Sequence, residues 1–195
     1  MRTILLTCCL FMGTILSAQN NVLIEIENAN AAYKVITGDF VRTQTNVAKG
    51  TSIKADGTLY IVGEDQMAQY YKAPSTDLLI INGNDFYMIR GKKTNKFNTE
   101  KNKTMRSLRN TLLYCVHGKP MVLATENGAE ITAEKKANEY EVVLISTKKT
   151  ARGYAKIVLT YDLKSKLLTK MRMDEYNGNS TLYEMNNLKT NGNID

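Results

Sequence analysis

The feature that most constrains the fold is a succession of short segments in which apolar and polar residues alternate. This period of two places every second side chain on the same face of a β-strand. Turn residues separate the segments, and Asn82-Gly83 is a strong signal for a β-hairpin. About ten or eleven strands, mostly joined by hairpins, predict a mainly β protein with one large antiparallel sheet that curls. The predicted strands cover residues 36–46, 50–62, 66–73, 77–82, 85–91, 119–125, 129–134, 139–147, 153–161, 166–176 and 180–189.

Two other segments have helical periodicity. Apolar residues recur at near-helical spacing over residues 22–35 and again over residues 104–117. In the second segment Thr104 can cap the start of a helix, and Gly118 and Pro120 can end it. A helix inserted among hairpins must bury its apolar face on the sheet. We therefore expect an N-terminal helix and a helix near 104–117 to cover the concave face.

Residues 1–19 have the organisation of a cleavable secretory signal. Arg2 supplies the positive charge, and an apolar stretch of about a dozen residues follows, which is too short for a stable membrane span. Small residues allow cleavage after Ala18 or Gln19. One alternative is an uncleaved membrane anchor. Another is a lipoprotein signal, although Cys8 and Cys9 lie in the middle of the apolar stretch instead of near its end.

Loss of the signal leaves Cys115 as the one remaining cysteine, so residues 20–195 are expected to fold as a single domain without a disulfide. The formal net charge falls from +7 to +6 with the loss of Arg2. A basic chain that is exported is a poor fit to nucleic acid. A membrane surface, an acidic protein partner and an ordinary solvated surface remain as explanations of the charge.

The sequence offers no recognisable catalytic set. His117 is the one histidine, and with Cys115 it gives too few ligands for a stable metal site. We expect Cys115 to pack in the core and His117 to lie near a helix C-terminus, where its charge is favoured. No GxSxG, phosphate-loop or dinucleotide glycine pattern occurs. Asp174-Glu175 are adjacent strand residues that face opposite sides, so we expect ordinary surface charge. The sequence predicts neither an enzyme nor a cofactor.

Methionine is frequent among the apolar residues. Of the nine methionines, seven follow residue 19, and the chain has no tryptophan. Methionine is flexible and suits surfaces that accept variable apolar ligands, although it also fills ordinary cores. Met171 and Met173 are two apart on one predicted strand, and Met67 and Tyr71 are four apart on another, so each pair shares a face. A curved sheet under a helix and lined by such side chains is typical of a small apolar cavity.

Several segments, in this order and spacing, resemble the periplasmic outer-membrane lipoprotein carrier (LolA) family. The resemblance covers about residues 22–195, and the collinear set carries it more than any single motif. It implies an unclosed β-barrel with helices over its mouth. The matching segments are Ile36-Thr37-Gly38-Asp39-Phe40 into Gln44, Gly57-Thr58-Leu59-Tyr60-Ile61, Ala73-Pro74, Leu79 through Tyr87, Asn110-Thr111-Leu112-Leu113 and Leu182-Tyr183 through Asp195.

The resemblance implies a carrier that shelters acyl chains of lipoproteins in an apolar cavity and shuttles them through the periplasm from the inner to the outer membrane. The implied partners are acylated lipoproteins, the inner-membrane lipoprotein-releasing ABC transporter and an outer-membrane acceptor, with the carrier as a monomer. Two other functions remain open. The chain could bind another amphiphile, such as a glycolipid or fatty acid, or it could be a structural periplasmic protein with a filled core.

This sequence departs from the family in two places. The family usually has Arg-Pro soon after the strand 57–61, and that arginine is linked to closing the cavity and releasing cargo. The corresponding stretch here is Val62-Gly63-Glu64-Asp65, so the closure is missing or replaced. The sequence also stops at Asp195, where relatives commonly continue.

Two groups of residues are candidates for the site. Alternation and position under the helix select the walls of an acyl-chain cavity, and a basic stretch that includes Lys92, Lys93 and Lys96 is a candidate docking surface for the donor transporter or anionic headgroups. The alternative for the first group is ordinary core, and for the second a solvated surface. The basic stretch continues through Lys101, Lys103, Arg106 and Arg109. The wall residues are Phe40, Leu59, Ile61, Met67, Tyr71, Leu79, Ile81, Phe86, Met88, Leu108, Leu112, Met171 and Met173.

Overall fold

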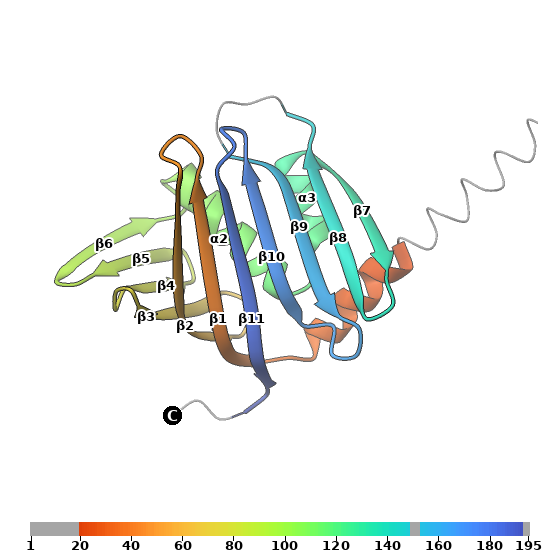
Figure 1. The fold of residues 1–195 in the computed structure, drawn as a ribbon. Coiled ribbons are helices and arrows are strands. Elements are labelled where there is room, and N and C mark those ends of the chain that lie inside the picture. Colours follow the sequence, from red (N-terminus) through yellow and green to blue (C-terminus); the bar gives the residue numbers. More distant parts are fainter. Residues whose placement is uncertain (1–19, 149–152, 193–195) are drawn as a thin grey trace, which may run out of the picture.

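A computed structural model of the chain describes residues 20–148 and 153–192. Its main element is one 11-stranded antiparallel sheet in the order β6-β5-β4-β3-β2-β1-β11-β10-β9-β8-β7 (Figure 1). The sheet is not closed, since β6 and β7 remain edge strands, and the predicted fold class is confirmed. The strands are β1 Val35–Asn46, β2 Thr51–Val62, β3 Gln66–Ala73, β4 Leu78–Asn82, β5 Asp85–Arg90, β6 Lys93–Asn98, β7 Ala129–Lys135, β8 Glu139–Ser146, β9 Tyr154–Asp162, β10 Leu168–Glu175 and β11 Ser180–Thr190.

The sheet joins the two halves of the chain at its centre, where β1 pairs with β11. Phe40 on β1 stands opposite Met185 on β11 and opposite Gly57 on β2. A Cβ atom added to Gly57 would lie 2.1 Å from the carbonyl oxygen of Tyr70 and 2.8 Å from Cζ of Phe40. Glycine at this position therefore lets the Phe40 ring and the β3 main chain approach β2 closely.

In the described part of the chain three helices accompany the sheet: an N-terminal helix over residues 20–31, α2 Lys103–Val116 and α3 Pro120–Asn127. Helices α2 and α3, which we call the helical cover, lie against one face of the sheet (Figure 1). The N-terminal helix packs beside the junction between them, because a Cβ on Gly118 would lie 2.9 Å from Cγ2 of Ile26. None of the helices within the described residues is long and apolar enough to cross a membrane.

The sequence-based boundaries were wrong in three places. Residues 119–125, predicted as a strand, belong to helix α3, where Pro120 occupies the first turn and Leu123 and Ala124 are buried. A short apolar run cannot be assigned to strand or helix by periodicity alone. Strand β6 was not predicted, because it is a polar edge strand that pairs with β5 through its backbone. The cap of α2 is Asn102, whose side chain accepts from the N–H of Met105, and not Thr104.

The N-terminal helix ends earlier than predicted, at residue 31, and β1 begins at Val35. Residues 1–19, for which we predict a secretory signal, lie outside the described residues.

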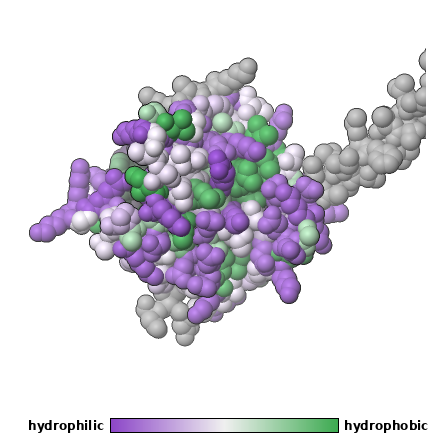
Figure 2. Space-filling view, viewed as in Figure 1, coloured by the Kyte–Doolittle hydropathy of each residue, from purple (hydrophilic) through white to green (hydrophobic). Residues whose placement is uncertain are grey.

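The two faces of the sheet differ in composition. The convex face, seen in Figure 2, is largely hydrophilic with scattered apolar side chains. Alternation along the strands places the exposed Val62, Tyr70 and Ile145 on this side of the sheet. The concave face lies under the helical cover and supplies most of the core. The core therefore lies between the sheet and the helices.

Candidate functional site

The concave face brings the predicted wall residues together. All thirteen belong to one hydrophobic cluster or pack against it. Met88 and Leu108 are only partly buried, and the other eleven are buried. Period-two alternation thus identified the correct face of each of these strands. The pairs Met171–Met173 and Met67–Tyr71 each lie on one face, as predicted.

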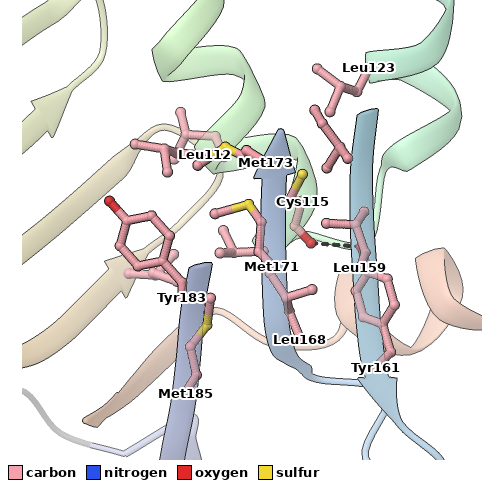
Figure 3. Packing of buried hydrophobic residues seen from close by; sticks show 14 of the residues in the cluster. Leu112, Cys115, Leu123, Leu159, Tyr161, Leu168, Met171, Met173, Tyr183 and Met185 are labelled. Atoms are coloured by element: carbon pink, nitrogen blue, oxygen red, sulfur yellow. Dashed lines mark hydrogen bonds between the residues drawn. The ribbon is translucent and has the colours of Figure 1, made fainter. Parts of the chain in front are cut away.

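The second half of the sheet also contributes many side chains to this face, and the sequence-based selection took only Met171 and Met173 from it. The same alternation in residues 139–147, 153–161 and 180–189 could have found these side chains. Figure 3 shows Leu159 and Tyr161 on β9 and Tyr183 and Met185 on β11 in this core. The missed residues are Tyr140, Val142, Leu144, Ile157, Leu159, Tyr161, Tyr183 and Met185.

Two polar side chains on the concave face were also missed. Gln69, on β3 between Met67 and Tyr71, is buried, and its Oε1 accepts a hydrogen bond from the Tyr71 hydroxyl at 3.1 Å. Arg42 follows Phe40 by two positions on β1, and its guanidinium carbon lies 4.7 Å from the centre of the Tyr71 ring. The face is therefore apolar over most of its area and polar near Tyr71.

Hydrogen bonds to the main chain hold α2 on the sheet. The Tyr161 hydroxyl, on β9, donates to the carbonyl oxygen of Cys115 at 2.9 Å within the core (Figure 3). At the other end of the helix, Arg106 Nε donates to the carbonyl oxygen of Thr99 at 2.9 Å. Arg109 Nε donates to the carbonyl oxygen of Gly83 at 2.7 Å. The helix is tied to the β4–β5 turn, to the segment after β6, and to β9.

A carboxylate joins the two helices of the cover. Glu126 on α3 accepts from Asn110 Nδ2 at 2.8 Å and from the Tyr114 hydroxyl at 2.9 Å, both on α2. Burial and the hydrogen bond to Glu126 raise the pKa of Tyr114. These contacts make α2 and α3 one structural unit.

The β2–β3 turn contacts the helical cover through an ion pair. Glu64 lies 3.2 Å from Lys119 Nζ, at the junction of α2 and α3. The hydrogen bond from Lys119 lowers the pKa of Glu64. This is the stretch in which the family resemblance implies an arginine. Here the turn carries the negative charge and the cover carries the positive charge. Because the Glu64 side chain is 81% exposed, the pair contributes little to stability.

Cys115 and His117 are both buried at the end of α2. Cys115 packs in the core as predicted, and burial raises the pKa of its thiol. The expectation that the charged form of His117 is favoured is wrong. Burial, and next the charge of Lys119, lower its pKa, because loss of hydration outweighs attraction to the helix C-terminus. Within residues 20–148 and 153–192 no group of three or more His, Cys, Asp or Glu side chains could hold a metal ion.

Three small voids adjoin the concave face among residues 20–148 and 153–192. A void of about 10 Å³ lies within the apolar core, between Leu59, Val116 and Met185. A second of about 40 Å³ adjoins Arg42 and Tyr71. A third, of about 200 Å³, lies where the helical cover meets β7, β8 and β9, and its walls include the polar Glu126, Ser146 and Lys156. Ligand pockets usually measure roughly 300–1,000 Å³, so a long acyl chain requires the face to open.

The basic stretch divides into two groups. Lys92 and Lys93 are exposed at the end of the β5–β6 hairpin. Lys96 instead lies 2.8 Å from the carboxylate of Asp85, an ion pair that raises the pKa of the lysine. Arg106 and Arg109 bond main-chain carbonyls, as described above. Lys101 and Lys103 are also exposed and form no ion pair within the described residues, so the free charge lies at the hairpin and at the start of α2.

Comparison with solved structures shows the same fold in a protein of very different sequence. A DUF1329 family protein from Desulfovibrio piger matches with a TM-score of 0.51 and 9% identity, over 93% of this chain and 95% of the other. A putative outer membrane lipoprotein-sorting protein domain from Vibrio parahaemolyticus gives 0.48 and 13%, over 92% and 94%. A LolA superfamily protein from Nitrosomonas europaea gives 0.43 and 8%, over 91% and 95%. At such identities the first likeness shows the fold alone, and the other two are too distant to add to it.

A search of curated protein sequences gave no significant match. The sequence model for the outer membrane lipoprotein carrier protein LolA, in contrast, matches residues 31–195. That match spans both halves of the sheet, the helical cover and most of the chain, and we conclude that this chain belongs to the LolA family.

Proposed function

We propose that residues 20–195 form a periplasmic carrier that shelters the acyl chains of lipoproteins on its concave face and moves them from the inner to the outer membrane. Family and fold fit a lipoprotein or lipid carrier in the periplasm. The observation that carries the proposal is the continuous apolar concave face beneath two helices, which themselves hold no catalytic constellation. Proteins of this family act as carriers and not as enzymes.

The physical need for such a face follows from the hydrophobic effect. An acyl chain of about sixteen carbons gains up to roughly 12 kcal/mol on leaving water, at about 0.8 kcal/mol per methylene. A lipoprotein cannot cross an aqueous compartment unless its chains are sheltered. The shelter must also release them, and flexible side chains such as Met171, Met173 and Met185 allow both.

Binding requires the helical cover to move away from the sheet. The voids on the concave face are smaller than an acyl chain, so cargo has to replace the contacts that Leu112 and Val116 of α2 make with the strands. Few hydrogen bonds join the cover to the sheet, and the Glu64 side of the Glu64–Lys119 ion pair is exposed to solvent. In our proposal this pair stands where the family arginine would act.

A second candidate function is a structural periplasmic protein. It is favoured by the small voids in the apolar core, since a core filled by its own side chains needs no ligand. The two functions differ in whether the concave face ever opens.

The test is to purify the exported chain from its native envelope and identify bound molecules by mass spectrometry. Triacylated lipoproteins support the carrier, other lipids support a binding protein for another amphiphile, and an empty protein supports the structural role. Met173→Gln, which places an amide on the apolar face, should abolish co-purification. Met121→Gln is the matched control, because Met121 is 42% exposed on α3. Equal cargo in both variants would contradict binding on the concave face. The mass of the purified chain also tests cleavage after Ala18 or Gln19.

We also propose that Lys92, Lys93 and Lys96 dock on the inner-membrane lipoprotein-releasing transporter or on anionic headgroups. The exposed lysines at the hairpin support this, although Lys96 is already paired with Asp85. Charge reversal at Lys92 and Lys93 should weaken donor binding and reduce its salt dependence. Reversal of Lys54, which is exposed on β2, is the control. Unchanged donor binding in the hairpin variant would leave these lysines as solvated surface.

A further inference from the structure

Arg42 is a cation on an otherwise apolar surface. It lies on β1 opposite Ala55 of β2 and Tyr183 of β11, both of which are buried. Phe40, two positions earlier, faces the core, so Arg42 faces the same side of the sheet. Its guanidinium stacks on the Tyr71 ring at 4.7 Å. An inward arginine on this face is costly unless its charge and its N–H groups are matched.

The charge of Arg42 is not matched by the protein. Its Nε atom is buried and has no hydrogen-bond partner within the described residues. None of the ion pairs formed by residues 20–148 and 153–192 includes it. The adjacent carboxylate, Asp77, lies 3.6 Å from Nε of Arg90 instead. Two guanidinium groups and one carboxylate leave one positive charge here.

A small void of about 40 Å³ separates these groups, and its other walls are apolar. Arg42, Asp77 and Arg90 form its polar side, and Leu79 and Met88 form its apolar side together with Tyr71. Tyr71, Leu79 and Met88 belong to the concave cluster or pack against it. The guanidinium of Arg42, which has no ion-pair partner within the described residues, therefore lies directly beside the apolar concave face.

We propose that Arg42 binds the anionic head, a carboxylate or phosphate, of an amphiphile whose acyl chain lies on the concave face. A guanidinium with a free donor forms a charge-assisted hydrogen bond with such an oxygen, and Tyr71 holds its plane in position. This inference rests on the proposed binding of acyl chains and adds the chemistry of the head. It favours an acidic amphiphile over the uncharged lipid anchor of a lipoprotein, and so it favours the second kind of cargo named above, another amphiphile.

The experiment compares acyl ligands that differ only in the charge of the head. The full exported chain is loaded with the neutral fluorescent probe N-phenyl-1-naphthylamine, which is displaced by palmitate or by methyl palmitate. We expect palmitate to displace the probe at about tenfold lower concentration, the effect of one charge-assisted hydrogen bond. Arg42→Gln should remove this preference, and Arg42→Lys should retain part of it. Arg172→Gln, on the exposed side of β10, should leave it unchanged.

Further ligands distinguish failure of the Arg42 proposal from failure of the proposed function. Butanoate and inorganic phosphate should not displace the probe, because they lack the acyl chain. Displacement by either at the same concentration as palmitate would overturn the proposal in favour of a simple anion site. Equal displacement by palmitate and its methyl ester would overturn the role of Arg42 while leaving acyl binding intact. If neither acyl ligand displaces the probe, the proposed function fails, and this inference fails with it. Urea unfolding of each variant confirms that it is folded.

Discussion

At the scale of single residues, the concave face depends on close packing around Phe40. The Phe40 ring packs edge-on against Tyr71, with ring centres 5.0 Å apart, and lies over Gly57. The main-chain carbonyl of Tyr70 approaches Gly57 from the next strand. No side chain fits between these groups without displacing backbone.

We predict that Gly57→Ala destabilises the protein. The added methyl group must displace Phe40 or β3, and overpacking of this kind costs about 1–3 kcal/mol. Urea unfolding followed by circular dichroism measures the change. Lys54→Ala on the exposed side of the same strand is the control, with an expected change within about 0.5 kcal/mol. Equal stability of the two variants would show that β2 and β3 separate easily.

We predict that His117 makes the protein less stable as the pH falls. Burial lowers its pKa in the folded state, so the unfolded chain binds the proton first. The free energy of unfolding should fall as the pH drops below the ordinary value of 6.5, and the loss should end at the lowered pKa of the folded state. The measurement is urea unfolding between about pH 8 and pH 5.5.

His117→Gln should flatten this part of the pH profile. Four carboxylates have lowered pKa values: Glu25, Glu64, Asp85 and Asp162. They lose their stabilising effect only at more acidic pH, below the ordinary values of 4.5 for the two glutamates and 3.8 for the two aspartates. These carboxylates therefore do not change the free energy of unfolding between about pH 8 and pH 5.5. A profile that stays equally steep in the variant would rule out His117 as its cause.

At the scale of elements, the helical cover is the part that decides whether the concave face is accessible. It is held by apolar contacts from α2 and by a small number of hydrogen bonds to the sheet and its turns. Of these bonds, Tyr161 to Cys115 is buried, whereas Glu64–Lys119 is exposed. The buried bond should therefore contribute more to keeping the cover in place.

We predict that Tyr161→Phe loosens α2. The variant removes the donor to the Cys115 carbonyl and should cost about 0.5–1.5 kcal/mol. Amide hydrogen exchange should show faster exchange in Lys103–Val116 than in the strands. Tyr33→Phe removes a comparable bond, to the Ser165 carbonyl at 2.8 Å, away from the cover. Faster exchange in both variants alike would mean that the effect is global.

At the scale of the whole molecule, the unclosed sheet supplies a large apolar face that a movable cover can hide. The edge strands do not pair with each other, so the sheet can change its curvature without breaking its ladder of hydrogen bonds. A closed barrel of the same strands would have a fixed interior. This architecture combines a closed resting state with a surface for a long ligand.

We predict that a bound amphiphile exposes Cys115. The thiol is fully buried beneath the cover, and burial raises its pKa, so it should react slowly with Ellman's reagent. Palmitate should accelerate the reaction severalfold in a Cys8→Ser, Cys9→Ser chain, because α2 must move. A rise in the unfolding temperature with palmitate shows binding and excludes unfolding as the cause. Binding without faster labelling would contradict movement of α2.

The sequence by itself determined the class of fold and the inward side of the strands, because alternation with a period of two is a local property. It placed Phe40, Leu59 and Met171 on the correct face, and it located helix α2 to within one residue. It could not separate strand from helix over the short run that became α3, nor detect β6, whose pairing needs only backbone.

Only the tertiary structure decided how the two halves share one face and which polar groups meet there. The polar groups of one void come from three segments: Arg42 from β1, Tyr71 from β3 and Asp77 from the loop after β3. Glu64 and Lys119, which form an ion pair, are 55 residues apart in the sequence. Alternation tells which way a side chain points but not what it faces across the sheet. Whether the concave face is open or filled depends on how α2 packs, and that is a property of the assembled core.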